Sequence, residues 1–352
     1  MKKLASMLLA LALVLSMVCC ASAEGTIELA LITDSGTIDD KSFNQGCYEG
    51  MQQYAEENGK EYNYYKPTEF TTDGYLAQID IAVQNGAKMI ICPGFMFAEA
   101  LGQAQQIYPD VSFVIVDSAP TVEGVEQIDA NVLSVMYAEE QSGFLAGYAA
   151  VKDGYTKLGF MGGMAVPAVI RFGKGFAQGA ETAAAELGLT DIELMYHYTG
   201  SFDATPEAQT LAASWYEAGT EVIFACGGSV GNSVMSAAEA AGKAVIGVDG
   251  DQSGESETVI TSAMKGVSAS VYEAVTEFYD GTFEGGRQII CDAANGGVQL
   301  PMASSRFKTF SQEDYDALFA KVVSGEYAVN NSTDDMTPGD LGLTIVKTTV
   351  VE

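Results

Sequence analysis

The sequence predicts an α/β protein built from two doubly wound parallel-sheet lobes with a ligand cleft between them. Three observations predict this class. Apolar strands alternate with amphipathic helices of about 10–15 residues, which is typical of parallel sheets with right-handed crossovers. The alternation stops once and then restarts. At 352 residues, the chain is also long enough for two domains of roughly 150 residues each.

The first lobe begins near residue 27 with the apolar strand LALIT, and the spacing of apolar residues predicts a helix over 43–57. The next elements repeat this pattern: a strand at 62–65, a helix from residue 74, the strand KMIICPG, a helix from residue 97 and the strand VSFVIVD. A connecting stretch, IDANVLSVMYAEEQSGFLAGYAAV, then separates this lobe from the second one.

The second lobe restarts with KLGFMGG and continues through IELMYHY, EVIFACGG, AVIGVDGD and VITSAMK, followed by a helix over 267–280. We assign 24–130 plus 252–290 to the N-terminal lobe and 131–251 plus 291–352 to the C-terminal lobe. Short crossings should join the lobes, because no long Pro-rich or Gly/Ser-rich linker occurs. The tail from residue 330 has weak periodicity, and no element is predicted there.

The N-terminus has the features of a secretory signal. Two lysines precede an apolar run over 4–18, and the small residues ASA follow it, as at a leader-peptidase site. The run is shorter than the roughly 20 residues that cross a bilayer. We therefore predict a signal peptide over 1–23 and an exported protein at the extracytoplasmic face of a bacterial membrane. Cys19 and Cys20 leave lipid anchoring open, although the preceding SMV matches a lipoprotein box poorly.

The formal charge of −30, or −32 without the two leader lysines, restricts the class of partner. Such a field repels phosphates and anionic lipid headgroups, so nucleic acid is excluded as a partner. Simple solubility accounts for most of this charge. Cys92 and Cys226 lie in apolar runs and are predicted to be buried free thiols, although a disulfide remains open in an exported chain.

Ligands of open parallel sheets bind outside the carboxyl ends of the strands, and four such ends here read TDSG, CPGF, FACGG and GVDGD. Asp39, Asp40 or Ser42 can cap the helix over 43–57, but capping does not explain Asp34 at the strand end. A carboxylate there can accept hydrogen bonds from a ligand. Phe43, in the first helical turn, is either a ring that stacks on a flat ligand or a core residue.

Asp249 and Asp251 lie at the end of the strand AVIGVD and are predicted to mirror Asp34, which would place acids on both sides of the cleft. A carboxylate can hold both hydroxyls of a ribose. Lys265 can neutralise one acid and donate to the same hydroxyls. The competing interpretation is loop acids with a surface lysine. The predicted ligand-binding set is Asp34, Phe43, Asn44, Asp117, Gly228, Asp249 and Lys265.

Residues 227–231 satisfy GxSxG between a strand and a helix, which is the setting of a hydrolase nucleophile. That fold orders its triad as Ser, acid, His, whereas the one histidine, His197, precedes Ser229 and leaves the serine without a general base. The glycines suit a loop that lets backbone approach a ligand. No dinucleotide fingerprint and no Walker motif occurs, so we predict no cofactor.

Several blocks in one order carry a family resemblance: TDSGTIDDKSFNQG, ANVLSVMYAEEQSGFLAGYAA, FMGGMAVPAVIRFGKGFAQG, FACGGSVGN and GVDGDQ. From about residue 27 to residue 265, the chain resembles the basic membrane protein family, the purine-nucleoside receptors that feed ABC importers. The resemblance implies a type I periplasmic-binding-protein fold, with a base held between aromatic rings and a ribose held by acid and lysine.

The family motifs place Phe43 in a stacking role, Asp34 and Asp249 as polar contacts and Lys265 at the ribose. Phe172 is a candidate for the second ring. The sequence CGGSVGN departs from the alanine-rich AAGGTG pattern of the family, which leaves base selectivity open.

The resemblance implies a binding protein and not an enzyme, which delivers a purine nucleoside to an ABC permease. It would meet the membrane through that permease or a lipid anchor. Two alternatives remain: a binding protein of the same fold for a sugar or signalling molecule, and a secreted hydrolase that uses Ser229 or the pair Asp39 and Asp40. A repressor of this fold class is discarded, because no basic helix-turn-helix segment precedes residue 27.

Overall fold

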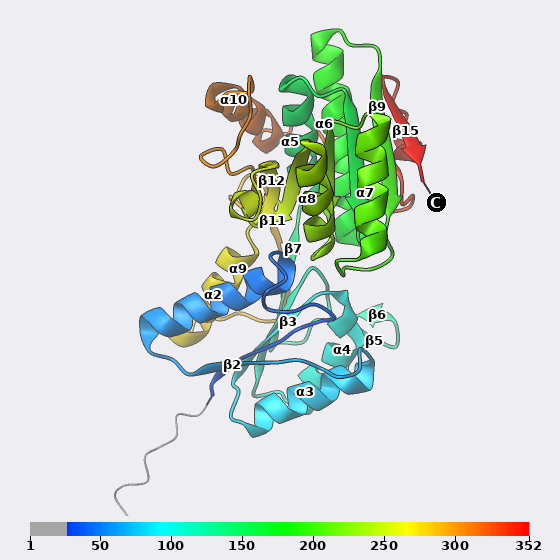
Figure 1. The fold of residues 1–352 in the computed structure, drawn as a ribbon. Helices are drawn as coiled ribbons and strands as arrows, with labels where there is room; N and C mark the ends of the chain where they lie inside the picture. The colour runs from blue at the N-terminus through cyan, green and yellow to red at the C-terminus, as the bar shows by residue number, and fades with distance from the viewer. Residues whose placement is uncertain (1–26, 352) are drawn as a thin grey trace, which may run out of the picture.

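The computed structural model describes residues 27–351 and consists of two α/β lobes, one above the other in Figure 1. The predicted fold class is confirmed, because each lobe is built on a predominantly parallel sheet. The predicted signal peptide over 1–23, with Cys19 and Cys20, lies outside the described residues. Within 27–351, no helix is both long enough and apolar enough to span a bilayer.

The sheet of the N-terminal lobe has six parallel strands in the order β13-β7-β4-β3-β1-β2. Helices α2 and α9 cover one face, where they pack on Leu29 and Leu31, and α3 and α4 cover the other, against Ala30 and Ile32. Both faces are buried, which explains the unbroken apolar strands. The strands are β1 (Leu29–Ile32), β2 (Tyr62–Tyr65), β3 (Met89–Pro93), β4 (Ser112–Val116), β7 (Val132–Tyr137) and β13 (Arg287–Cys291). The helices are α2 (Phe43–Asn58), α3 (Thr72–Gln84), η1 (Phe95–Phe97), α4 (Ala98–Ile107) and α9 (Val267–Asp280), and β5 (Thr121–Val122) pairs with β6 (Val125–Glu126) in a small hairpin.

The sheet of the C-terminal lobe has the order β14-β12-β11-β10-β8-β9-β15 and is parallel except for β14. Helices α7 and α8 cover one face, and α5 and α6 cover the other. The strands are β8 (Lys157–Gly162), β9 (Ile192–Tyr198), β10 (Val222–Cys226), β11 (Ala244–Asp249), β12 (Val259–Lys265), β14 (Val298–Gln299) and β15 (Val346–Val350). The helices are α5 (Glu139–Lys152), α6 (Pro167–Leu187), α7 (Pro206–Ala218), α8 (Val230–Ala241), η2 (Gln252–Gly254), α10 (Gln312–Val323) and η3 (Pro338–Leu341).

Five strands follow the same spatial order in both lobes, β2-β1-β3-β4-β7 in one and β9-β8-β10-β11-β12 in the other. Strand β11 therefore corresponds to β4, and Asp249 is the counterpart of Asp117, which follows β4. The prediction that Asp249 mirrors Asp34 was wrong, because Asp34 follows β1, whose counterpart is β8. The ends of β7 and β12 also correspond, which makes Tyr137 and Lys265 counterparts.

Two segments lie in the opposite lobe from the one predicted. Residues 131–137 contain β7, which pairs with β4 of the N-terminal sheet, and residues 252–265 contain β12, which pairs with β11 of the C-terminal sheet. The chain crosses between lobes after β7, after β12 and between β13 and β14. The first crossing thus follows β7 and the second follows β12, whereas the predicted lobe boundaries were placed before these two strands.

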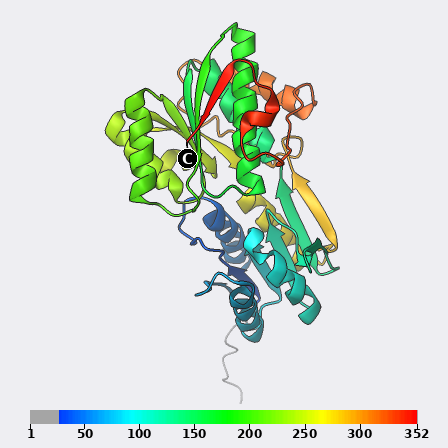
Figure 2. The ribbon, with the colours of Figure 1, turned by 90° about the vertical axis from the view of Figure 1, so that its right-hand side faces the viewer.

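The polar tail, for which no element was predicted, contributes the outermost strand of the C-terminal sheet. Strand β15 pairs in parallel with β9 and is drawn in red at the sheet edge in Figures 1 and 2. The carboxylate of Glu181 accepts backbone N–H groups of residues 344–346 and holds the approach to this strand.

Helices α5 and α6 pack with their backbones in contact, because each helix has two glycines at the crossing. A Cβ added to Gly147 of α5 would lie 2.0 Å from the carbonyl oxygen of Phe176 in α6. A Cβ added to Gly143, Gly175 or Gly179 would likewise come within 2.1 Å of a backbone carbonyl oxygen of the other helix. This crossing fixes the spacing of the two helix starts, of which the start of α6 lines the cleft described below and the start of α5 lies behind its wall.

We predict that Gly147→Ala lowers the free energy of unfolding by about 2–3 kcal/mol, because the methyl group forces the two helices apart. Chemical denaturation of both proteins measures the change. Gly254→Ala is the control, since a Cβ there meets open space, and its effect should stay within about 0.5 kcal/mol. An unchanged or higher stability of Gly147→Ala would contradict the close packing.

Candidate ligand-binding cleft

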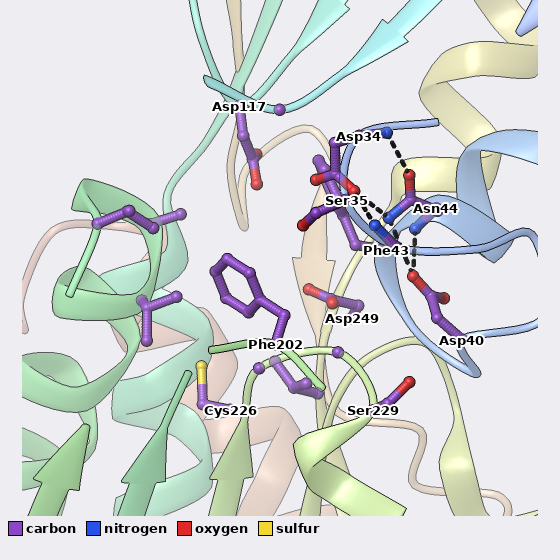
Figure 3. Close-up of a pocket in the computed structure, with 18 of the residues that line it drawn as sticks. Asp34, Ser35, Asp40, Phe43, Asn44, Asp117, Phe202, Cys226, Ser229 and Asp249 are labelled. Atoms are coloured by element: carbon purple, nitrogen blue, oxygen red, sulfur yellow. Dashed lines mark hydrogen bonds between the residues drawn. The ribbon is translucent and has the colours of Figure 1, made fainter. Parts of the chain in front are cut away.

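A cavity lies between the lobes, at the carboxyl ends of strands from both sheets (Figure 3). Its volume of about 180 Å³ is more than ten times the roughly 10–15 Å³ that one water molecule needs. The cavity therefore has the size for a small molecule. Every residue of the predicted ligand-binding set lies in its wall: Asp34, Phe43, Asn44, Asp117, Gly228, Asp249 and Lys265.

Asp34 follows β1 and is 7% exposed. Its Oδ1 accepts hydrogen bonds from the Gly36 N–H at 2.7 Å and from Asn44 Nδ2 at 2.9 Å. The other oxygen, Oδ2, has no donor within residues 27–351, and Figure 3 shows the carboxylate at the cavity edge. Gly94 leaves room for it, since a Cβ there would lie 3.1 Å from Oδ2. Asp34 thus offers the cavity one free acceptor.

Asp40 is the capping residue among the three that the sequence offered. Its carboxylate accepts the backbone N–H groups of Ser42, Asn44 and Gln45 at the start of α2, and also Nδ2 of Asn44. Asn44 in turn accepts the N–H of Asp34 at 3.1 Å. The capping acid therefore positions the amide that holds Asp34.

Burial raises the pKa of Asp34 to about 6, while the hydrogen bonds from Gly36 and Asn44 act in the opposite direction. The carboxylate is consequently ionised near neutral pH at a cost in folding stability.

Lys265, the last residue of β12, is 5% exposed, so it is not a surface lysine. Its ammonium contacts Asp117 and lies 3.5 Å from Asp249 Oδ1 and 4.0 Å from Glu139 Oε1. Burial alone would lower the pKa of Lys265, but the three carboxylates outweigh it and raise the pKa. Lys265 is therefore held as a cation between acids from both lobes.

The sequence did not identify Glu139 and Arg171 as parts of this cluster. Glu139 begins α5 directly after the first crossing and is fully buried, and Arg171 Nε of α6 donates to it at 2.6 Å. Neither residue follows a strand in the predicted elements, so no strand-end signal marked them. They support Lys265 from behind the cavity wall.

Asp117 and Asp249 both adopt the left-handed backbone conformation, with φ of 60° and 65°. This conformation is uncommon for residues other than glycine, and strained residues of this kind cluster at functional sites. The two residues occupy equivalent positions at the ends of β4 and β11. The same local geometry thus presents one carboxylate from each lobe.

Contacts between the lobes follow one edge of the cleft. The Ser42 hydroxyl donates to Asp249, Gln252 Nε2 donates to the carbonyl of Lys41 at 2.8 Å, and Lys41 lies 3.6 Å from Glu255. Residues 41 and 42 of the N-terminal lobe are therefore tied to the end of β11 and to the segment that follows it.

Two phenylalanines other than Phe43 lie in the wall. Phe172, the sequence candidate for the second ring, is only 2% exposed and packs edge-on against Phe224, so it belongs mainly to the core. Phe202 follows β9, and Figure 3 shows its ring projecting into the cavity from the C-terminal lobe, with Phe43 on the side of the N-terminal lobe. Phe202 was missed because it lies in a polar loop, YTGSFDATP, without periodicity.

The glycine-rich loop after β10 supports Phe202. The Ser229 N–H donates to the Phe202 carbonyl at 2.9 Å, and Gly228 has a φ of 53°. Ser229 lines the cavity, but His197 does not. The His197 ring is hydrogen-bonded through Nδ1 to the Val351 carbonyl at 2.7 Å, at the outer strands of the sheet.

The four cysteines of the described chain are free, and Cys92 and Cys226 are buried as predicted; Cys47 and Cys291 are the other two. Cys226 lies in the cavity wall, but burial raises its pKa well above the ordinary value. A protonated thiol is a poor nucleophile.

A family model described as ABC transporter substrate-binding protein PnrA-like matches residues 27–333. The chain belongs to this family, Bmp. It is 34% identical over 307 residues to the ABC transporter nucleoside-binding protein BmpA of Lactococcus lactis subsp. cremoris, covering 80% of this chain and 84% of that protein. It is also 30% identical over 320 residues to basic membrane protein A1 of Borrelia garinii subsp. bavariensis, covering 88% and 91%.

A solved structure of an ABC transporter solute-binding protein from Aeropyrum pernix K1 shares the fold, with a TM-score of 0.76 and 23% identity over 88% of this chain and 94% of that one. The expected type I periplasmic-binding-protein fold and the expected family are thus confirmed. As a Bmp family member, the chain is a substrate-binding protein of an ABC transporter, a class that binds its ligand outside the cytoplasm and works with permease components.

The raised pKa of Asp34 predicts that Asp34→Asn stabilises the ligand-free protein near neutral pH. The folded state takes up the proton near pH 6 and the unfolded state near the ordinary value of 3.8, so the wild type loses stability as the pH rises through this window. From pH 4 to pH 7, the variant should gain about 2–3 kcal/mol over the wild type.

Urea unfolding of both proteins across this range measures the difference. Asp203→Asn is the control, because Asp203 is an exposed acid of the same wall. It should follow the wild-type pH profile, and parallel profiles for Asp34→Asn and the wild type would contradict the prediction.

Proposed function

We propose that this protein captures a purine nucleoside between its lobes and delivers it to the permease of an ABC importer without catalysing a reaction. One observation carries the proposal. A single cavity of small-molecule size combines aromatic rings from both lobes, a free carboxylate oxygen of Asp34 and the cluster of Lys265 with Asp117 and Asp249. The name of the Lactococcus lactis relative, a nucleoside-binding protein, supports it.

The base would stack against Phe43 and Phe202. Stacking of a base on an aromatic side chain is worth about 1–3 kcal/mol and tolerates any base. Specificity for the base would come from its edge, where N–H groups can donate to Asp34 Oδ2. That oxygen is otherwise without a donor in a buried setting, so a ligand that supplies one gains the full value of the bond.

The ribose would meet Asp249, Asp117 and Lys265. A carboxylate can accept hydrogen bonds from two neighbouring hydroxyls, and an ammonium can donate to the same oxygens. These groups are already ordered by their mutual ion pairs, so little conformational entropy is lost when the ligand binds.

A binding protein of the same fold for a sugar would use the same acids, and thermal-shift screening of sugars against nucleosides separates the two. The hydrolase alternative lacks support, because the histidine needed to activate Ser229 is bonded to Val351 outside the cavity. Labelling by a serine-directed fluorophosphonate, or turnover of a nucleoside, would revive it.

We predict that the protein binds guanosine but rejects guanosine monophosphate. The phosphate would enter a cavity whose wall holds more carboxylates than ammonium groups, and the repulsion acts in a setting of low dielectric. Isothermal titration calorimetry with both compounds tests this. Equal affinities would overturn the charge argument, and no heat with any purine nucleoside would overturn the proposed function.

We also predict that Phe43→Ala and Phe202→Ala each weaken nucleoside binding about tenfold or more, since each removes one stacking surface. Phe70→Ala is the matched control, because Phe70 is 49% exposed and lies outside the cavity wall. Circular dichroism would verify that each variant is folded. Unchanged dissociation constants for the first two variants would refute the stacking role.

A further inference from the structure

The charges in the cavity wall are unbalanced, since five carboxylates face two ammonium groups. Lys265 is the buried cation of the pair and is already shared by three acids, whereas Lys66 is exposed. The acids are Asp34, Asp40, Asp117, Asp203 and Asp249. Ligand-free, the cleft therefore holds more negative charge than its own side chains neutralise.

Two carboxylate oxygens in this wall lack a hydrogen-bond donor within residues 27–351. One is Oδ2 of Asp34, a residue that is 7% exposed and lines the cavity, and the other is Oδ1 of Asp117, which is fully buried as an atom. An unsatisfied charged acceptor in a buried setting costs more than a neutral one. A ligand that brings positive charge as well as N–H donors would relieve this cost more than a neutral ligand.

The aromatic rings of the wall also favour a cation. The Lys265 ammonium lies 4.6 Å from the ring centroid of Phe43, within the range of a cation–π interaction. Lys265 already supplies the cation at Phe43, whereas no ammonium within residues 27–351 lies over the ring of Phe202. The face of an aromatic ring carries partial negative charge, so a flat cation stacked on Phe202 is attracted more strongly than a neutral ring of the same shape.

We infer that the cleft takes a second class of ligand, purine nucleosides whose base carries a fixed positive charge from ring N-methylation, and that it prefers them to uncharged bases of the same shape. The inference rests on the proposed function and adds the charge of the base to it. Asp34 is the residue that discriminates, because it combines a free oxygen, burial and a position at the cavity edge.

The probe that follows from this chemistry is 7-methylguanosine. Its methyl group lies on the imidazole side of the base, so the edge with N1–H and the exocyclic amine remains free to donate to Asp34. The positive charge is delocalised over the ring and strengthens those donors, and charge-assisted hydrogen bonds are roughly twice as strong as neutral ones.

The matched control ligand is 7-methyl-7-deazaguanosine, which has the same shape and no charge. Calorimetry with both, slightly below neutral pH so that N1–H is retained, isolates the effect of charge. We expect 7-methylguanosine to bind the wild type about tenfold more tightly than the control ligand. In Asp34→Asn, this ratio should fall to about threefold or less, whereas in Asp110→Asn, which changes an exposed acid outside the cavity wall, it should stay within about twofold of the wild-type ratio.

Guanosine is measured alongside, so that the two proposals can fail separately. If guanosine binds and the two methylated compounds bind equally, or neither of them binds, the inference is overturned while the proposed function stands. If Asp34→Asn keeps the full preference, the assignment to Asp34 is overturned. If none of the three compounds binds the wild type, the proposed function itself fails.

Discussion

The cleft depends on the buried ammonium of Lys265. Lys265 is the last residue of strand β12, and its ammonium meets carboxylates of Asp117 in one lobe and of Asp249 and Glu139 in the other. Removing a partner from such a buried ionic cluster would leave an uncompensated charge, which costs far more than the loss of a surface ion pair. The ion pairs of Lys265 thus connect the two lobes, and they are made by groups at the cavity.

Helix packing and helix capping outside the cavity hold the charged groups of the cleft in place. The glycine contacts bring α5 and α6 together at backbone distance, and the N-terminal parts of the two helices supply Glu139 and Arg171. At the start of α2, Asp40 satisfies the free N–H groups and orients Asn44, which holds Asp34. Asp34 and Lys265 are therefore each positioned by other buried polar groups, and this arrangement limits the freedom that a ligand would have to remove.

The elements were largely predictable from sequence, because strands buried on both faces give continuous apolar runs and the acids at their ends mark one edge of the sheet. The sheet to which each strand belongs could not be predicted in the same way, because it depends on pairing between segments that are distant in the sequence. For this reason β7 and β12 were placed in the wrong lobes. The strand β15 was missed in a polar tail. Phe202 reaches the cavity from a loop, and Glu139 meets Arg171 because two helices pack together. Neither arrangement produces a periodic pattern in the local sequence, so neither was predicted.

Tyr137 and Lys265 end equivalent strands of the two lobes, and the Lys265 ammonium lies 5.5 Å from the centre of the Tyr137 ring. Two lysines at these positions would have paired one ammonium with each of the equivalent acids Asp117 and Asp249. A phenol in one lobe and an ammonium in the other break that equivalence. The two lobes therefore present unlike groups to the cleft, because Lys265 lines the cavity and its counterpart Tyr137 does not, and a guest that pairs with this ammonium can do so in one orientation only.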